Sequence, residues 1–544
     1  MAVARPAAML RNAGANLVRT ARRLAARAAL PRRGAAWVVV RLSPHIEEIA
    51  PLRLPFASAS PLGLLDVLET LETAADDPRV AGVLLRFLGP LEGWSQVLSL
   101  RRAVQRLTER GKPVVAYGEI FGAESLVVAS GATRFWLPET GSVFLVGLRL
   151  ESLFLRRLLE RFEVRPEVVR VGSYKTAGEH FTRDHMSPEQ REQLEALADD
   201  LFEALVEAVA SGRGLDAAAV RERIDRGPYS GPAAVEAGLA DGCLYPDEVE
   251  RELFGLAPET ATEGPEARPH LIDAAVYHAL RVTDPGWRPL LRELPRIAYV
   301  VGRGAIHRGS GPRGIASESV RELLERIRRR PEIRGVVLRL DSPGGDGSAS
   351  DLLWRSVSLL TREKPVVVSM GDVVASGGYY MAAAADALFA EVGTITGSIG
   401  VVGGKVDLEG LYRRVGIAKE GVERGARAGL LSEARGFTPE ERAAVRDMLS
   451  SVYDTFLDRV ARGRGLSSEA LARVAEGRVW SGARAESLGL VDAIGGPLEA
   501  LREVRRRAGL RDEDRYLLEL HPRLPPLPSL LSLLRWRPGA MGSW

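Results

Sequence analysis

Residues 78–90 read PRVAGVLLRFLGP, and residues 331–343 read PEIRGVVLRLDSP. The leading proline, the glycine and the Leu-Arg pair coincide at an offset of 253 (331 − 78). Each stretch is a short run rich in valine and leucine and closed by a proline, which is the pattern of a buried strand. A match of this length indicates that a whole domain was duplicated, because a solenoid would repeat a much shorter unit.

The correspondence continues toward the C-terminus. SGRGL at 211–215 matches RGRGL at 462–466, an offset of 251 (466 − 215), so only small insertions separate the copies. Short apolar runs alternate with amphipathic stretches in both copies, which predicts an α/β fold with mainly parallel sheets. The expected strands are 37–42, 82–87 and 113–117, then 297–301, 335–340 and 365–369. The expected helices are 63–71, 94–110 and 187–211, then 317–329, 349–363 and 438–462.

A length of 544 residues suits two large domains, each able to bury a full core. Residues 257–269 are polar, proline-rich and aperiodic, which is typical of a linker. The predicted segments are a basic N-terminal extension (1–36), a first repeat (37–256), a linker (257–295), a second repeat (296–510) and a C-terminal tail (511–544). The tail includes an apolar, proline-broken stretch at 524–536 that we expect to pack in a core or an interface.

The charge of the chain is small overall but uneven. The net charge is +3, which does not suggest a nucleic-acid-binding protein, and the single Cys243 excludes an intramolecular disulfide framework. Residues 1–41 carry nine arginines and no acidic residue. No run reaches the roughly 18 to 20 apolar residues that span a bilayer. Residues 9–30 therefore predict a basic amphipathic helix, either a surface extension or a peripheral anchor on an anionic membrane.

The two copies differ where chemistry is expected. The second copy has Ala375-Ser376-Gly377-Gly378, and the first has Gly122-Ala123-Glu124-Ser125 at the same place. The first copy has Lys175, and the aligned residue of the second is Ala426. One copy thus keeps a serine and the other a lysine, which predicts a composite active site.

Ser376 follows a predicted strand and precedes a small-residue helix, where a serine is either a simple helix cap or a presented nucleophile. Upstream, Gly344 and Gly345 end another strand, and with Gly377 they could supply oxyanion-stabilising amides. No histidine lies in this glycine-rich region. Lys175 is therefore the candidate base, rather than a solvated surface charge, if burial brings its pKa near the working pH.

These residues resemble peptidase family S49, the long two-domain signal peptide peptidase A type, within the crotonase/Clp protease-like superfamily. The resemblance covers nearly all of residues 37–500 and is strongest at 172–187 (GSYKTAGEHFTRDHMS), 338–345, 375–380 and 396–401 (TGSIGV). It implies two tandem domains of that superfamily, Ser376 as nucleophile, Lys175 as general base and Ser398 as a hydroxyl that orients the lysine. It also implies a homotetramer that cleaves remnant signal peptides at a membrane.

Three positions depart from the pattern of that family. His180 stands where proline is common, Asp341 replaces an asparagine, and Asp346-Gly347 replaces Ser-Val after the glycines. None of these changes removes the serine or the lysine. The lack of an N-terminal span is a larger departure, so we expect a peripheral protein of the bacterial inner membrane, with a cytoplasmic protein as the alternative.

The sequence thus predicts a serine endopeptidase with a Ser/Lys dyad, acting on apolar peptides without ATP, a cofactor or a metal. No Walker-type nucleotide motif is present. The alternatives are a crotonase-like acyl-CoA enzyme and an inactive membrane-associated scaffold. Apolar residues beside the serine are expected to line the substrate pocket: Val373, Val374, Tyr379 and Met381.

Overall fold

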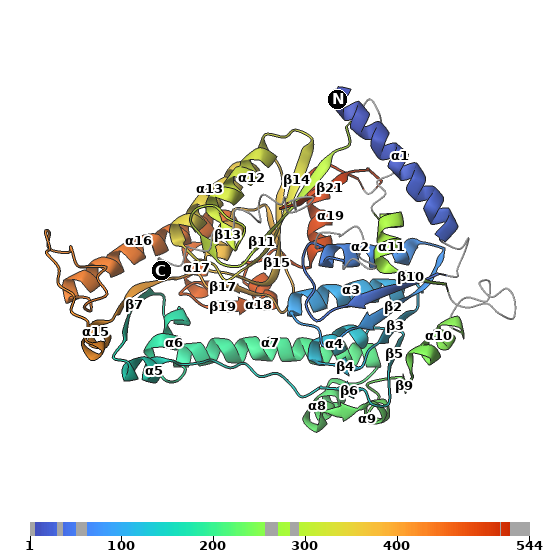
Figure 1. Ribbon diagram of the computed structural model, residues 1–544, viewed down its shortest axis with the longest axis horizontal. Coiled ribbons are helices and arrows are strands. Elements are labelled where there is room, and N and C mark those ends of the chain that lie inside the picture. The colour runs from blue at the N-terminus through green and yellow to red at the C-terminus, as the bar shows by residue number, and fades with distance from the viewer. Residues whose placement is uncertain are drawn as a thin grey trace.

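The computed structural model describes residues 6–29, 36–50, 62–255, 270–282, 293–511 and 513–522. Each repeat builds its own largely parallel sheet with helices packed against it, and the two units lie side by side (Figure 1). The predicted α/β fold with two tandem domains from an internal duplication is confirmed.

The first sheet has the order β10-β1-β2-β3-β5-β9, and every neighbouring pair is parallel. Buried aliphatic residues fill its central strands, as expected for a sheet covered on both faces. Its strands are β1 (Ala36–Leu42), β2 (Val80–Phe87), β3 (Val114–Tyr117), β5 (Arg134–Leu137), β9 (Gly242–Cys243) and β10 (His270–Asp273).

The second sheet has the order β19-β17-β15-β14-β11-β21, with β16 paired to β15 and β20 paired to β16. Only the β17–β19 pair is antiparallel in this sheet. Its strands are β11 (Arg296–Arg303), β14 (Ile333–Ser342), β15 (Val366–Ala375), β16 (Ala387–Ala390), β17 (Ile395–Gly397), β19 (Val479–Ser481), β20 (Ala493–Ile494) and β21 (Leu517–His521).

The outermost strands β10 and β21 differ from the predicted segment boundaries. Strand β10 falls inside the predicted linker 257–295 and pairs with β1, and β21 falls inside the predicted tail 511–544 and pairs with β11. Both are short and carry charged residues, so no apolar run marks them in the sequence. Each repeat therefore closes its sheet with a strand that follows the rest of the domain. The apolar stretch 524–536 lies outside the described residues.

Helices cover both sheets and fill the space between them (Figure 1). One hydrophobic cluster includes α2 and α3 of the first repeat together with Tyr299 of β11 and Leu498 of α19, so the repeats share a core. The helices that cover the two sheets are α2 (Leu64–Asp76), α3 (Trp94–Glu109), α4 (Ala123–Ala129), α12 (Ser317–Arg328), α13 (Gly347–Thr361), α14 (Gly377–Ala382) and α19 (Pro497–Arg507).

The other helices and the short strands pack around these layers, and α7 and α16 contribute side chains to the two large hydrophobic clusters. The helices are α1 (Pro6–Ala29), α5 (Arg156–Arg161), α6 (Glu179–Thr182), α7 (Pro188–Arg213), α8 (Ala217–Arg226), α9 (Gly231–Glu236), α10 (Pro246–Gly255), α11 (Ala274–Tyr277), α15 (Glu409–Val415), α16 (Pro439–Arg464), α17 (Ser468–Val474) and α18 (Gly482–Ser487). The short strands are β4 (Ile120–Phe121), β6 (Ser142–Val143), β7 (Arg165–Val171), β8 (Tyr229–Ser230), β12 (Ile306–His307), β13 (Ile315–Ala316) and β18 (Val401–Asp407).

The long helices α7 and α16 begin as the sequence predicts. Ser187 accepts a hydrogen bond from the Gln190 amide, Thr438 accepts one from the Glu441 amide, and a proline follows each cap. Helix α7 runs from the first repeat along the second (Figure 1). There Asp200 accepts hydrogen bonds from Ser481 and Arg484, which fixes α7 to the second repeat.

Helix α1 confirms a helix where residues 9–30 predict one, and it is amphipathic. Asn16 is buried, whereas Leu10, Leu17 and Leu24 are 77%, 74% and 61% exposed. Seven residues are almost two helical turns, so these leucines lie on one side of the helix. No helix in the described part of the chain has both the length and the apolar character needed to cross a bilayer.

Candidate active site

The structure brings Lys175 of the first repeat to Ser376 of the second. The lysine Nζ lies 3.0 Å from Ser376 Oγ and 2.9 Å from both the carbonyl oxygen and Oγ of Ser398. No carboxylate or histidine of the described residues contacts the Nζ. The three side chains that the sequence singles out therefore meet at one point.

Ser376 sits at the turn between β15 and α14, with φ +53° and ψ −121°. This conformation is strained for a residue with a side chain. It is held because the Ser376 amide donates to the Gly397 carbonyl at 2.9 Å and because Gly344 packs directly on the turn. A Cβ on Gly344 would lie 2.5 Å from the Gly377 nitrogen, so only glycine fits there.

The amides of the glycine turn are not equivalent. The Gly344 N–H donates to Ser342 Oγ at 3.2 Å, whereas no described residue accepts from the amides of Gly345 or Gly377. A Cβ built on Gly377 would lie 3.2 Å from the Gly345 nitrogen, so these two amides are neighbours. Gly345 is held in place by Ile306, whose carbonyl would lie 2.0 Å from an added Cβ.

Burial changes the chemistry of Lys175. The residue is only 5% exposed, and loss of hydration lowers the pKa of its ammonium from the usual 10.5 to about 8. Its three hydrogen-bond partners are neutral, so no nearby anion restores the charged form. A substantial neutral fraction at mildly alkaline pH follows, and a neutral amine can accept a proton from Ser376.

The pairing of β7 with β18 explains how a lysine of one repeat reaches a serine of the other. The two strands are antiparallel, with Val171 opposite Val401 and Arg165 opposite Asp407. Lys175 comes four residues after the end of β7, and Ser398 comes three residues before the start of β18. The register of this ribbon therefore places the lysine loop beside the Ser398 turn.

A turn of the second repeat at residues 475–478 contacts both the lysine loop and the Ser398 turn. Glu476 accepts hydrogen bonds from the Tyr174 amide through its carbonyl (2.8 Å) and from the Ser173 amide through Oε2 (3.0 Å). On its other side, the Gly477 amide donates to the Ile399 carbonyl at 2.7 Å. A Cβ on Gly477 would lie 2.6 Å from the Lys175 backbone nitrogen, so the two backbones are too close for a side chain at position 477.

Glu476 is itself constrained. Its φ is +59°, and it is one of four residues other than glycine with positive φ in the described chain. Two of the others, Ser376 and Ser398, are at the same site. The Tyr453 hydroxyl donates to Glu476 Oε1 and accepts from its amide, both at 3.2 Å. Sequence analysis missed this turn, since a lone Glu-Gly pair in a loop carries no pattern that points to a distant lysine.

The expected lining of the substrate pocket is wrong for three of its four residues. Val374, Tyr379 and Met381 are buried in the core of the second repeat and cannot line a pocket, because their side chains point inward from β15 and α14. Val373, the fourth expected residue, is only partly buried. Asp346 caps α13 by accepting from the Ala349 amide, and Asp341 accepts from the Val373 amide, so both replacements are bonded to the backbone within the fold.

The histidines nearest Lys175 in the sequence take no part in the dyad. His180 Nδ1 contacts the Leu153 carbonyl at 2.8 Å, and its ring stacks on Phe154. His185 is exposed and pairs with the adjacent Asp184. Neither ring contacts Ser376 or Lys175.

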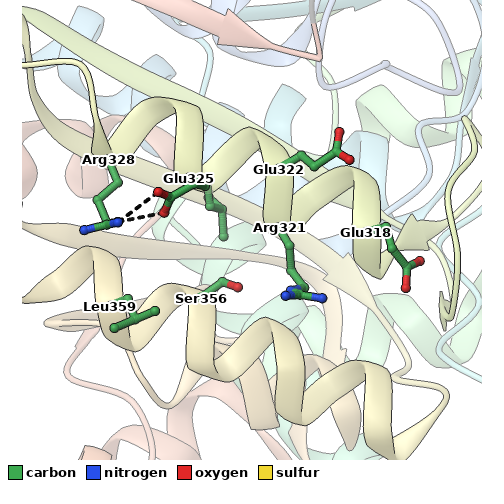
Figure 2. A pocket seen from close by; sticks show the side chains of 8 residues that line it. Glu318, Arg321, Glu322, Glu325, Arg328, Ser356 and Leu359 are labelled. Carbon is green, nitrogen blue, oxygen red and sulfur yellow. Dashed lines mark hydrogen bonds and ion pairs between the residues drawn. The ribbon is translucent and has the colours of Figure 1, made fainter.

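The groove in Figure 2 is separate from the dyad. It lies between α12 and α13, with a volume of about 400 Å³, and its walls are mostly charged side chains of α12. Glu325 and Arg328 pair across one turn of that helix. Neither Lys175 nor Ser376 lines this groove.

The chain is similar to known peptidases. Residues 106–257 and 358–511, one region in each repeat, match the model of peptidase family S49. The chloroplastic serine protease SPPA of Arabidopsis thaliana is 35% identical over 481 residues, which cover 87% of this chain and 70% of the relative. Protease 4 of Salmonella typhi is 28% identical, covering 82% of this chain and 72% of the relative. A putative signal peptide peptidase SppA of Enterococcus faecium is 32% identical over 35% of this chain and 55% of the relative.

Proposed function

We propose that Ser376 is the nucleophile and Lys175 the general base of this chain, which belongs to peptidase family S49 and is a serine-type endopeptidase. The observation that carries the proposal is the 3.0 Å contact between a buried amine and the serine hydroxyl. The lowered pKa of Lys175, about 8, supports it further. At pH 7 such a lysine is neutral in about one molecule in ten.

In the first step, neutral Lys175 accepts the proton of Ser376 as Oγ attacks the carbonyl carbon of the scissile peptide bond. The tetrahedral intermediate carries a negative charge on the former carbonyl oxygen. Its collapse breaks the C–N bond, and the protonated lysine donates its proton to the leaving amine. The products are a free amine and an ester of Ser376, with Lys175 neutral again.

The second step releases the acyl group. A water molecule gives a proton to Lys175 while its oxygen attacks the ester carbon. The bond from that carbon to Ser376 Oγ then breaks, and the lysine returns the proton to Oγ. Ser398 accepts hydrogen bonds from Nζ through its carbonyl, and its hydroxyl also contacts Nζ, which supports a role in aiming the lysine at the serine.

The oxyanion is assigned to the amides of Gly377 and Gly345. Both amides have no acceptor among the described residues, and they lie next to each other beside Ser376. Gly344 is less suited, because its N–H already donates to Ser342 Oγ. Its role is to bring the backbone close, since no side chain fits at that position.

The alternative activities fit less well. An acyl-CoA enzyme would need glycine-turn amides but not a buried lysine from one repeat against a serine from the other. An inactive scaffold would not need the strained conformation of Ser376 or a desolvated Lys175. Neither alternative is supported by an observation of its own.

The proposed substrates are extended apolar peptides such as remnant signal peptides, cleaved without ATP. The support is the name of the Enterococcus relative, a putative signal peptide peptidase. The proposed location is the surface of an anionic membrane, the bacterial inner membrane in the predicted setting, with a cytoplasmic location as the alternative. The exposed leucines of α1 and the nine arginines of residues 1–41 support the membrane surface.

Peptide-library cleavage tests the proposed activity. Wild-type protein, Ser376→Ala and Ser398→Ala are compared without nucleotide, and products are identified by mass spectrometry. We expect cleavage after small or medium apolar residues by the wild type and none by Ser376→Ala. Cleavage confined to sites after Lys, Arg, Asp or Glu would contradict the apolar preference, and a Ser376→Ala protein that cleaves at the wild-type rate would contradict the nucleophile.

A further inference from the structure

Two adjacent residues of α7 hold the chain on both sides of Lys175. The Tyr174 hydroxyl donates a hydrogen bond to Glu192 Oε2 at 2.7 Å. The side-chain amide of Gln193 donates one to Thr176 Oγ1 at 2.9 Å, and Gln193 is buried. Because these two contacts involve the residues immediately before and after the lysine, α7 fixes the lysine loop from both ends.

The same two residues of α7 also bind two adjacent residues of the second repeat. Glu192 Oε1 lies 2.7 Å from an Nη of Arg478, and Gln193 Oε1 accepts a hydrogen bond from the Val479 amide at 3.2 Å. The Arg478 carbonyl in turn accepts a hydrogen bond from the Ser398 amide at 2.7 Å. Glu192, Gln193 and Arg478 therefore connect the lysine loop to the turn whose serine contacts the lysine amine.

Arg478 is also stacked between two aromatic rings. Its guanidinium carbon lies 4.9 Å from the centroid of the Tyr174 ring and 4.5 Å from that of Trp480. A cation at such a distance is attracted to the face of an aromatic ring. Trp480 packs on Gly397, whose carbonyl accepts a hydrogen bond from the Ser376 amide. One arginine side chain thus contacts the residue before the proposed base and, through Trp480, the turn that holds the proposed nucleophile.

We propose that Arg478, Glu192 and Gln193 are positioning residues for peptide hydrolysis. Together they set the distance between the Lys175 amine and the Ser376 hydroxyl and hold the amine in its buried place. In the described chain none of the three contacts either reactive atom, so they act through the backbone and side chains of the lysine loop. The inference rests on the proposed Ser/Lys dyad and adds the residues that aim it.

A planar guanidinium suits the place of Arg478, because it offers two flat faces and a hydrogen-bonding edge at once. The faces lie over the rings of Tyr174 and Trp480, and the edge meets the Glu192 carboxylate. A lysine ammonium is a compact charge that can pair with the carboxylate but cannot stack flat between two rings. Arg478→Lys should therefore preserve only part of the positioning.

The test measures kcat, the Tm and the pKa of Lys175, read from its ¹³C ε-methylene signal by NMR, in Arg478→Met and Gln193→Leu. We expect kcat to fall by about 10- to 100-fold and the lysine to titrate above 8, because a loosened amine is farther from the serine and better hydrated. The matched control is Arg484→Met, which removes a bidentate pair between α7 and the second repeat, with Asp200, that does not touch the lysine loop. It should keep the wild-type kcat and midpoint at a similar loss of Tm.

Two milder variants keep the test decisive if the larger changes weaken folding. Arg478→Lys should have a kcat between those of the wild type and Arg478→Met, and Tyr174→Phe should raise the Lys175 midpoint by less, because the loop loses one hydrogen bond and keeps the stacked ring. A wild-type midpoint in all folded variants, or an equal shift in Arg484→Met, would overturn the inference. The titration needs no substrate, so that result leaves the dyad standing, whereas hydrolysis by Ser376→Ala overturns the dyad itself.

Discussion

Lys175 and Ser376 are 201 residues apart in the chain, and their reactive atoms are 3.0 Å apart in the structure. Each belongs to a different copy of a duplicated domain. The first copy has Ala123 where the second has Ser376, and the second has Ala426 where the first has Lys175. The site exists only when the β7–β18 ribbon and the shared core have formed. The proposed dyad therefore forms only when the two repeats are correctly docked.

Ser376→Ala should abolish peptidase activity and leave the fold intact. Loss of a nucleophile lowers kcat by roughly 10⁴-fold or more, whereas removal of one hydroxyl that donates no bond to the backbone changes stability little. Activity on a fluorogenic apolar peptide and the Tm measured by calorimetry check the two halves of this expectation. Substantial hydrolysis by the folded variant would rule out the assignment.

The rate of the wild-type enzyme should rise with pH through a midpoint near 8. Only neutral Lys175 can accept the serine proton, and burial lowers its pKa to about 8, so the competent fraction grows over this range. Lys175→Ala should be as inactive as Ser376→Ala, and the double variant no worse, because the pair acts as a unit. His180→Ala and His185→Ala should keep the wild-type profile, and loss of activity in either would mean that the base is misassigned.

Lys175→Met should stabilise the folded protein at pH 7. The pKa of Lys175 is lower in the folded state (about 8) than in the unfolded state (about 10.5), so burying its charge destabilises the fold below pH 8. That penalty is relieved as pH rises from 8 to 10.5, because the folded state then binds fewer protons than the unfolded state. The gain from Met is at most ~3 kcal/mol at pH 7. Urea unfolding at pH 7 and pH 10 measures it, and an equal gain at both pH values would contradict the cause.

Glu476→Gly should lower kcat by about 10- to 100-fold without loss of stability. Glycine adopts the +59° φ of this position freely but has no carboxylate to accept a hydrogen bond from the Ser173 amide. The lysine loop is then held less firmly, and Nζ is no longer kept in position beside Ser376. Glu476→Gln keeps an acceptor and should remain close to wild type.

The pKa of Lys175 directly reports whether Glu476 holds the lysine loop in place. The chain has only five lysines, so ¹³C-lysine labelling gives few ε-methylene signals to titrate by NMR. In Glu476→Gly the Lys175 signal should titrate above its wild-type midpoint, because a looser loop is better hydrated. An unchanged midpoint together with wild-type kcat would show that Glu476 does not position the lysine.

Helix α1 should bind anionic membranes. Exposed Leu10, Leu17 and Leu24 can enter the interface, and each arginine near an anionic surface adds roughly 1 kcal/mol at low salt. Co-sedimentation with vesicles containing phosphatidylglycerol should be lost on deletion of residues 1–30 and reduced by serine at the three leucines, while kcat stays unchanged. Equal binding by full-length and truncated protein, or binding that survives molar salt, would place the anchor elsewhere.

Much of the fold was readable from local pattern. The strands β2 and β14, the caps Ser187 and Thr438, and the duplication itself follow from residue order, since apolar spacing and cap chemistry act over a few residues. The edge strands β10 and β21 were missed because short strands with charged residues carry little periodicity. The expected pocket lining failed at Val374, Tyr379 and Met381, because apolar character shows that a residue is buried but not whether it faces a ligand or the core.

The sequence by itself determined that two copies of one domain exist, that one kept a serine and the other a lysine, and that glycines surround the serine. Only the tertiary structure decided that Lys175 reaches Ser376, that its pKa falls to about 8, and that Gly345 rather than Gly344 has a free amide beside Gly377. The physical reason is that dehydration and hydrogen-bond occupancy depend on all the groups around a residue. Those groups come from β7, β18, the 475–478 turn and the glycine turn, which lie far apart in the chain.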